Sequence, residues 1–122
     1  MKKSDLNGRT IKKQCNHLKN TDSVAQRYHN KNKSGGNFGF TVKILKPESE
    51  WTEGPLGGTK KHEWVADITG NYNTDGEITR LSLGEYGGVA SEIPADLETL
   101  IDRLEKHIEQ YSGFRPEEGA DQ

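Results

Sequence analysis

The sequence predicts a small α+β protein in which an antiparallel sheet of three to four strands is covered on one face by a single C-terminal amphipathic helix. Three observations support this fold class. Apolar residues recur at helical spacing between residues 93 and 111, and they alternate with polar residues over residues 38–44 and 64–68. Eighteen of the 23 Leu, Ile, Val and Phe residues lie between residues 38 and 111, so the core is expected there. One helix on a small antiparallel sheet is a stable two-layer arrangement.

The helix has the clearest pattern in the chain. Its apolar stripe consists of Ile93, Leu97, Leu100, Ile101, Leu104, Ile108 and Tyr111. Ser91 or a neighbour is expected to cap its start, and Pro94 is tolerated in the first turn. Gly113 and Pro116 follow the last apolar residue and are typical of a helix end.

Three strands are expected before this helix. Phe38–Ile44 places alternate apolar residues on one face, and Trp64, Ala66 and Ile68 do the same in the second strand. The third, Glu77–Leu83, needs a bulge to bring its apolar residues to one face. Residues 70–76 are predicted to join the last two strands as a hairpin, and a short fourth strand is expected around Val89. Residues 47–61 are rich in glycine and are expected to form a long connection. The sequence leaves open whether this connection folds only on binding.

Charge divides the chain into two blocks of opposite sign. Residues 1–35 carry nine Lys and Arg against two acids, whereas the rest carries eight against seventeen. We therefore expect a basic N-terminal arm over 1–36, an α+β domain over 37–112 and a flexible acidic tail over 113–122. Ile11, Cys15 and Leu18 share helical spacing, and a second helical turn capped by Asp22 or Ser23 would reach Tyr28. The arm is therefore expected to be partly helical or flexible. Residues 30–36 are expected to form a linker.

The overall composition limits the class of protein. A single cysteine, Cys15, excludes an internal disulfide framework. The N-terminus lacks the apolar stretch of a secretory signal, and no apolar run is long enough to cross a bilayer. A cytoplasmic protein of one domain, without contact to a membrane, is expected.

Nucleic-acid binding is one functional hypothesis. Phe38 and Phe40 would project from the same strand face, as base stacking requires, and Asn37–Val42 resembles the aromatic strand motif of RNA-recognition and cold-shock domains. The resemblance covers these six residues, departs at Asn37 where the motif has glycine, and is not followed by a second aromatic strand. The preferred interpretation is that both rings belong to the core, which a protein with few aromatic residues needs. The cations expected to contact phosphates are Lys12, Lys13, Lys19, Arg27, Lys31 and Lys33.

Catalytic and metal sites have little support in the sequence. Cys15 and His17 lack the closely spaced companions of a zinc site, so Cys15 is expected to be a buried structural thiol. His62, Glu63 and Asp67 are the one acid–base group worth naming, because Glu63 and Asp67 would share a strand face. A solvated, charged sheet face is the preferred interpretation. No cofactor and no metal are expected.

Protein binding is therefore the preferred hypothesis. Trp51 lies in the long connection near Lys60 and Lys61, and a tryptophan there would either anchor a protein interface or close the open edge of the sheet. We expect a small non-enzymatic binding or regulatory protein that occupies a macromolecular partner, of the inhibitor, immunity or phage and plasmid accessory type. A nucleic-acid-binding module is the second hypothesis and a small RNA hydrolase the third. The identity of the partner and the oligomeric state stay open.

Overall fold

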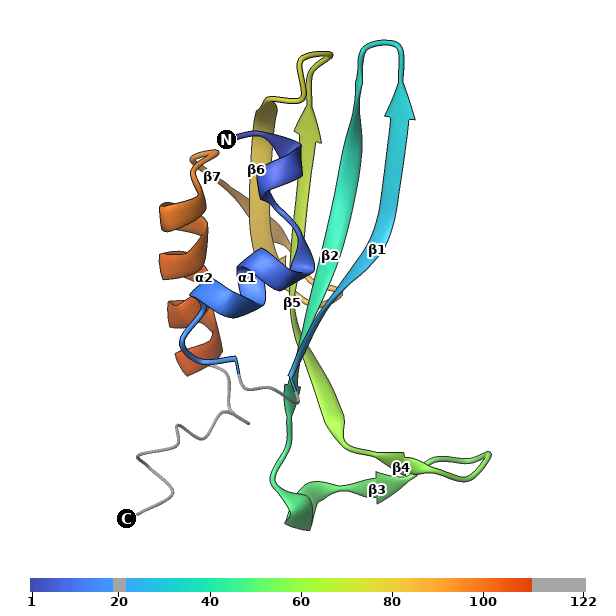
Figure 1. Cartoon of the computed structure of the whole chain (residues 1–122). Helices are drawn as coiled ribbons and strands as arrows, with labels where there is room; N and C mark the ends of the chain where they lie inside the picture. Colours follow the sequence, from blue (N-terminus) through green and yellow to red (C-terminus); the bar gives the residue numbers. More distant parts are fainter. Residues whose placement is uncertain (19–21, 111–122) are drawn as a thin grey trace.

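The protein is an α+β structure built on one five-stranded antiparallel sheet (Figure 1). The computed structural model describes residues 1–18 and 22–110. The sheet has the strand order β1-β2-β5-β6-β7, so each strand lies beside its neighbour in the chain. The strands are β1 (Ser23–Asn32), β2 (Gly35–Leu45), β5 (His62–Tyr72), β6 (Ile78–Glu85) and β7 (Ala90–Ile93).

A second, smaller sheet is inserted between β2 and β5. It pairs β3 (Thr52–Glu53) with β4 (Thr59–Lys60) and is preceded by the short 3-10 helix η2 (Glu48–Glu50). This β3–β4 ribbon projects away from the main sheet (Figure 1). The antiparallel α+β class and the C-terminal helix are confirmed, but the main sheet is larger than the predicted three to four strands.

The C-terminal helix α2 (Leu97–Gln110) buries the predicted apolar stripe against the sheet. Its buried residues are Leu100, Ile101, Leu104 and Ile108. The helix begins later than predicted: Ser91 and Ile93 belong to β7, and the Asp96 carboxylate accepts hydrogen bonds from the Thr99 N–H at 3.0 Å and hydroxyl at 2.9 Å. Asp96 is thus the capping residue in place of Ser91. Tyr111, Gly113 and the predicted tail over 113–122 lie outside the described residues.

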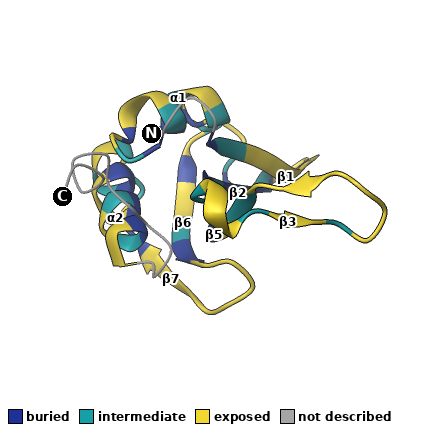
Figure 2. Ribbon diagram, turned by 90° about the horizontal axis from the view of Figure 1, so that it is seen from below, coloured by how far each residue is buried: buried dark blue, intermediate teal, exposed yellow. Residues whose placement is uncertain are grey.

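The N-terminal residues are built into the core, unlike the predicted arm. Leu6, Ile11, Cys15 and Leu18 are buried in the same cluster as the sheet residues. Leu6 directly follows the short helix η1 (Lys3–Asp5), Ile11 lies in helix α1 (Gly8–Gln14), and residues 23–32 form β1. The expected second helical turn toward Tyr28 and the linker over 30–36 are therefore wrong. The N-terminal segment is ordered because one helix does not cover a five-stranded sheet. Helix α2 contacts β5 and β6, and α1 packs beside β1 (Figure 2).

The first residues also pair with the start of β6. The Lys3 N–H donates to the Gly76 carbonyl at 2.7 Å, and the Ile78 N–H donates to the Met1 carbonyl at 2.9 Å. These bonds join the chain before η1 to the β5–β6 turn. The predicted hairpin is present, but its turn covers residues 73–77 instead of 70–76, because residues 70–72 continue β5. The start of the chain lies against this turn.

Two bulges decide which face several side chains occupy. In β5, Ala66 pairs with Val42 but Trp64 pairs with Lys43, so Val65 is the extra residue. In β6, Ile78 pairs with Tyr72 and Arg80 with Asn71, so Thr79 is the extra residue. The second bulge brings Ile78 to the same face as Leu81 and Leu83, as the sequence required. The first turns Trp64 away from the core face on which it was predicted.

Candidate binding face

One face of the main sheet is covered by none of the helices in the described residues, and we call it the outer face. Residues directly opposite each other in an antiparallel sheet point to the same side, so the register defines its members. One row consists of Ala25, Thr41, Asp67, Gly84 and Ala90, and the next consists of Tyr28, Gly39, Thr69, Ser82 and Glu92. Lys43 and Trp64 continue the face toward the β3–β4 ribbon.

Aromatic and cationic side chains alternate across the outer face. The Trp64 and Tyr86 rings meet edge to face with centroids 4.5 Å apart. The Lys43 ammonium lies 4.9 Å from the Trp64 centroid, and the Arg27 guanidinium lies 5.7 Å from that of Tyr86. We call Lys43, Trp64, Tyr86 and Arg27 the aromatic–cation cluster. Trp64 is 38% exposed and Tyr86 42%, so each ring keeps surface available for a partner.

A half-buried carboxylate holds this cluster in place. Asp67 accepts a hydrogen bond from the Thr41 hydroxyl at 3.0 Å and another from the Gly87 N–H at 3.3 Å. Its other contact is an ion pair with Arg27 at 3.5 Å. Asp67 thereby connects β1, β2 and the β6–β7 turn to β5. A fixed aromatic surface loses little conformational entropy on binding, which favours recognition.

A cleft of about 560 Å³ continues the cluster toward the β3–β4 ribbon. Its lining residues are Lys46, Thr52, Lys60, His62, Glu63, Trp64 and Tyr86. The cleft therefore has aromatic rings on one side and the polar ribbon on the other. Lys60, predicted to contact a partner, is one of its walls.

Trp51 and Lys61 lie together at the base of the ribbon. The Lys61 ammonium is 4.8 Å from the Trp51 ring centroid, and the Trp51 indole N–H donates to the Lys46 carbonyl at 2.9 Å. Trp51 is half-buried and fixes the ribbon to the end of β2, so part of its surface serves the fold. The fully exposed apolar side chain of this region is Leu56, at the ribbon tip.

Comparisons with known proteins do not assign this chain to a family. No family model matches the sequence, and no curated protein and no solved structure match it.

The residues predicted to contact nucleic acid are dispersed. Phe38 and Phe40 are 0% and 1% exposed, so the interpretation of both rings as core residues is confirmed, and they offer no stacking surface. Both rings point to the helix-covered face because this face needs large side chains to fill it. Lys12 and Lys13 lie on α1, Arg27 and Lys31 on β1, and Lys33 in the β1–β2 turn. Lys19 lies outside the described residues.

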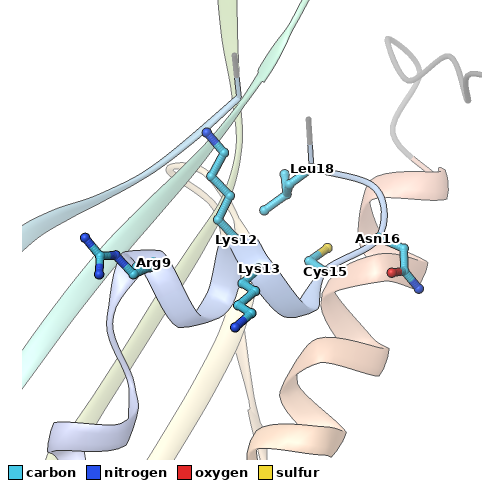
Figure 3. A pocket seen from close by; sticks show the side chains of 6 residues that line it. All are labelled: Arg9, Lys12, Lys13, Cys15, Asn16 and Leu18. Carbon is cyan, nitrogen blue, oxygen red and sulfur yellow. The ribbon is translucent and has the colours of Figure 1, made fainter. Parts of the chain in front are cut away.

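Several of these cations line a hollow beside α1, but their charged groups do not converge on one point. The hollow measures about 600 Å³ and is lined by Arg9, Lys12, Lys13, Cys15, Asn16 and Leu18. The side chains of Arg9, Lys12 and Lys13 point in three different directions (Figure 3). A single phosphate is bound best by donors that converge on it. The hollow is therefore a diffuse basic surface.

The acid–base group predicted in β5 is not assembled. Glu63 pairs with Ile44 and Asp67 with Thr41, and the bulge at Val65 places the two carboxylates on opposite faces. Within residues 1–18 and 22–110, no three His, Cys, Asp or Glu side chains lie close enough together to hold a metal ion. Cys15 is buried as expected, and burial raises the pKa of its thiol to about 11. None of the helices in the described part of the chain has the length and apolarity needed to cross a bilayer.

Sequence reasoning missed the main members of the candidate site. The alternating pattern predicted Trp64 in the core, and no pattern indicated Tyr86 or Lys43 as members of a site. One signal was available: Trp64 and Val65 are adjacent large apolar residues followed by Ala66, and simple alternation cannot place all three inside. A β-bulge at Val65 resolves this conflict, because it turns Trp64 to the opposite face and exposes it.

Proposed function

We propose that this protein is a non-enzymatic binding protein that occupies a macromolecular partner through the outer face of its sheet. The single observation that supports this is the pair of half-exposed rings, Trp64 and Tyr86, fixed by flanking cations beside an open cleft. Protein interfaces are enriched in Trp, Tyr and Arg, and these residues contribute most of the binding energy. A partner of protein class is therefore the preferred one.

The arrangement around the cluster supports binding over chemistry. Asp67, the best-held carboxylate of the outer face, is engaged by Arg27, Thr41 and the Gly87 N–H. A general base must be within reach of a substrate proton, but these contacts direct Asp67 toward the protein itself. Its role in the proposal is to position Arg27 and the β6–β7 turn.

Affinity capture with a matched pair of variants tests the proposal. The wild-type protein should recover a stoichiometric protein from lysate, and a Trp64→Ala/Tyr86→Ala variant should recover at least tenfold less, because hot-spot aromatics typically contribute about 2 kcal/mol or more each. Leu56→Ala/Val89→Ala is the matched control, since it removes two exposed apolar side chains outside the cluster. Thermal unfolding of each variant checks that the fold is kept. Capture of nucleic acid alone would contradict a protein partner.

Nucleic acid is the second candidate, and one observation favours it. From residue 6 to residue 47, Asp22 is the single acid among nine Lys and Arg. Asp22 is buried and accepts a hydrogen bond from the Leu45 N–H. The surface contributed by this stretch is therefore basic, as phosphate binding requires.

A further inference from the structure

β1 forms one of the two edges of the main sheet, and β7 forms the other. In the strand order β1-β2-β5-β6-β7, β1 pairs with β2 on one side and with none of the described strands on the other (Figure 1). Its residues from Ala25 to Asn32 are exposed along the whole strand. Helix α1 approaches only the beginning of β1, where Gly8 lies against the Val24 carbonyl.

The second half of this edge is regular. A bulge at Arg27 interrupts the pairing with β2, and from Tyr28 to Asn32 each residue again has a single partner. Along such an edge, alternate residues present both their N–H and their C=O away from the sheet. A further strand satisfies these donors and acceptors together, which is how extended peptides add to sheets.

The edge also has a uniform charge. No acid occurs between Ser23 and Pro47, whereas Arg27, Lys31 and Lys33 lie on β1 or in the turn that follows it. Helix α1, which packs beside the start of β1, adds Arg9 and Lys13. Charge complementarity therefore selects an acidic occupant, and it steers the encounter from a distance.

Two other occupants fit less well. A second copy of this chain would bring the same cations face to face across a β1–β1 pairing, and like charges opposite each other destabilise a sheet. A nucleic-acid backbone offers phosphate acceptors but leaves the edge carbonyls unsatisfied. It would also find one exposed aromatic ring on β1, Tyr28, and that ring already covers Gly39.

We propose that an acidic, extended segment of a protein partner pairs with Tyr28–Asn32 and becomes a sixth strand of the main sheet. This inference rests on the proposed function and specifies the chemistry of the partner. The segment would carry Asp or Glu on the face where it lies beside Lys31 and strand-favouring residues at the alternate positions, because successive side chains of a strand point to opposite faces. The outer-face cluster, to which β1 contributes Arg27, would then contact the same partner.

Selection of displayed random peptides of about twelve residues on the full-length protein tests the proposal, since such a length spans the five-residue site and its flanks. The expected result is a consensus rich in Asp and Glu at alternate positions. Selected peptides should bind a Lys31→Glu/Lys33→Glu variant roughly tenfold more weakly. Arg103→Glu/Lys106→Glu, which makes the same change of charge at exposed positions of α2, should bind them unchanged. Failure of the selection, or a consensus without acids, would overturn the proposal.

Backbone pairing is tested separately from charge. A selected peptide with N-methyl groups at alternate residues keeps its side chains but loses the N–H donors of one edge. It should bind roughly tenfold more weakly than the unmodified peptide. Equal binding would show an electrostatic contact without a sixth strand. Tighter binding of a single-stranded oligonucleotide than of any peptide, lost in Lys31→Glu/Lys33→Glu, would assign the edge to nucleic acid instead.

The two proposals fail in different ways. If Lys31→Glu/Lys33→Glu captures the protein partner normally while Trp64→Ala/Tyr86→Ala does not, the sixth-strand inference is wrong and the proposed function stands. If the wild-type protein captures no protein at all, the proposed function itself is wrong.

Discussion

Among individual residues, the buried side chains of the N-terminal segment have the largest consequences for stability. Leu6 and Ile11 are completely buried, and Cys15 is 2% exposed. Each fills space between α1 or η1 and the helix-covered face of the sheet. These side chains therefore belong to the core, although they lie in the most basic part of the sequence.

Truncation of Ile11 tests this placement. Ile11→Ala should lower the free energy of unfolding by about 2–5 kcal/mol, because it removes buried methyl groups and leaves a cavity. Denaturant unfolding measures the loss. Lys13→Ala, an exposed neighbour on α1, should change stability by about 0.5 kcal/mol or less. Equal stability of Ile11→Ala and the wild type would restore the view of a solvated arm.

The buried thiol of Cys15 is expected to make the free energy of unfolding depend on pH in the alkaline range. Burial raises the pKa of its thiol from the usual 9.0 to about 11, so the folded state retains the proton after the unfolded state has lost it. The stability from this group is complete below pH 9 and is lost as the pH rises toward 11. We expect the stability difference between the wild type and Cys15→Ala to fall over this interval in denaturant titrations. A constant difference would contradict the burial of the thiol.

Among the elements, α2 depends on its first turn. Asp96 caps the helix through the N–H and hydroxyl of Thr99, and these hydrogen bonds lower the pKa of the Asp96 carboxyl. Asp96→Ala should reduce the melting temperature, and Asp96→Asn, which keeps an acceptor, should retain most of it. Because the folded pKa is lowered, the advantage of Asp over Asn is present at neutral pH and is lost on acidification. Thermal unfolding at neutral and acidic pH measures both effects.

The β3–β4 ribbon is expected to be separable from the fold. The Lys46 N–H donates to the Lys61 carbonyl at 2.9 Å, so these residues already face each other at the end of the β2–β5 pairing. Replacing residues 47–60 by Asn-Gly should close a two-residue hairpin turn there. We expect the melting temperature to change by only a few degrees and capture of the partner to weaken, since the cleft loses Thr52 and Lys60. Loss of cooperative unfolding would show that the ribbon supports the core.

In the whole molecule, the two charge blocks meet between the α1 region and α2. The Asn16 N–H donates to the Glu105 carboxylate at 2.7 Å, and the His17 ring lies 2.6 Å from the Glu109 carboxylate. The basic segment is therefore held against the acidic helix at one end, while its other end forms the β1 edge. Of the two cations on β1, Arg27 is paired with Asp67 and Lys31 is exposed at the sheet edge.

Deletion of residues 1–35 should abolish the fold. The deletion removes the edge strand and four core side chains, Leu6, Ile11, Cys15 and Leu18, and it uncovers β2. We expect the truncated chain to lose its cooperative thermal transition and its dispersed amide spectrum. A truncated protein that still unfolds cooperatively would show that residues 36–110 form the core alone.

Local sequence patterns determined the C-terminal helix and the strands around Phe38–Ile44 and Ile68. Their apolar residues repeat with the period of one element, and burial of that stripe or face is sufficient to fix it. The hairpin joining β5 and β6 was predictable for the same reason, because its turn chemistry is local. The class of the fold followed from these elements.

Tertiary structure decided the remainder. β1 contains mostly polar residues and is a strand because β2 offers it hydrogen-bonding partners, and no local pattern shows this. α1 packs against the sheet because α2 alone is too narrow to cover all five strands. The candidate site depends on a bulge at Val65, since a shift of one residue exchanges the two faces of a strand and moves Trp64 from the core to the outer face.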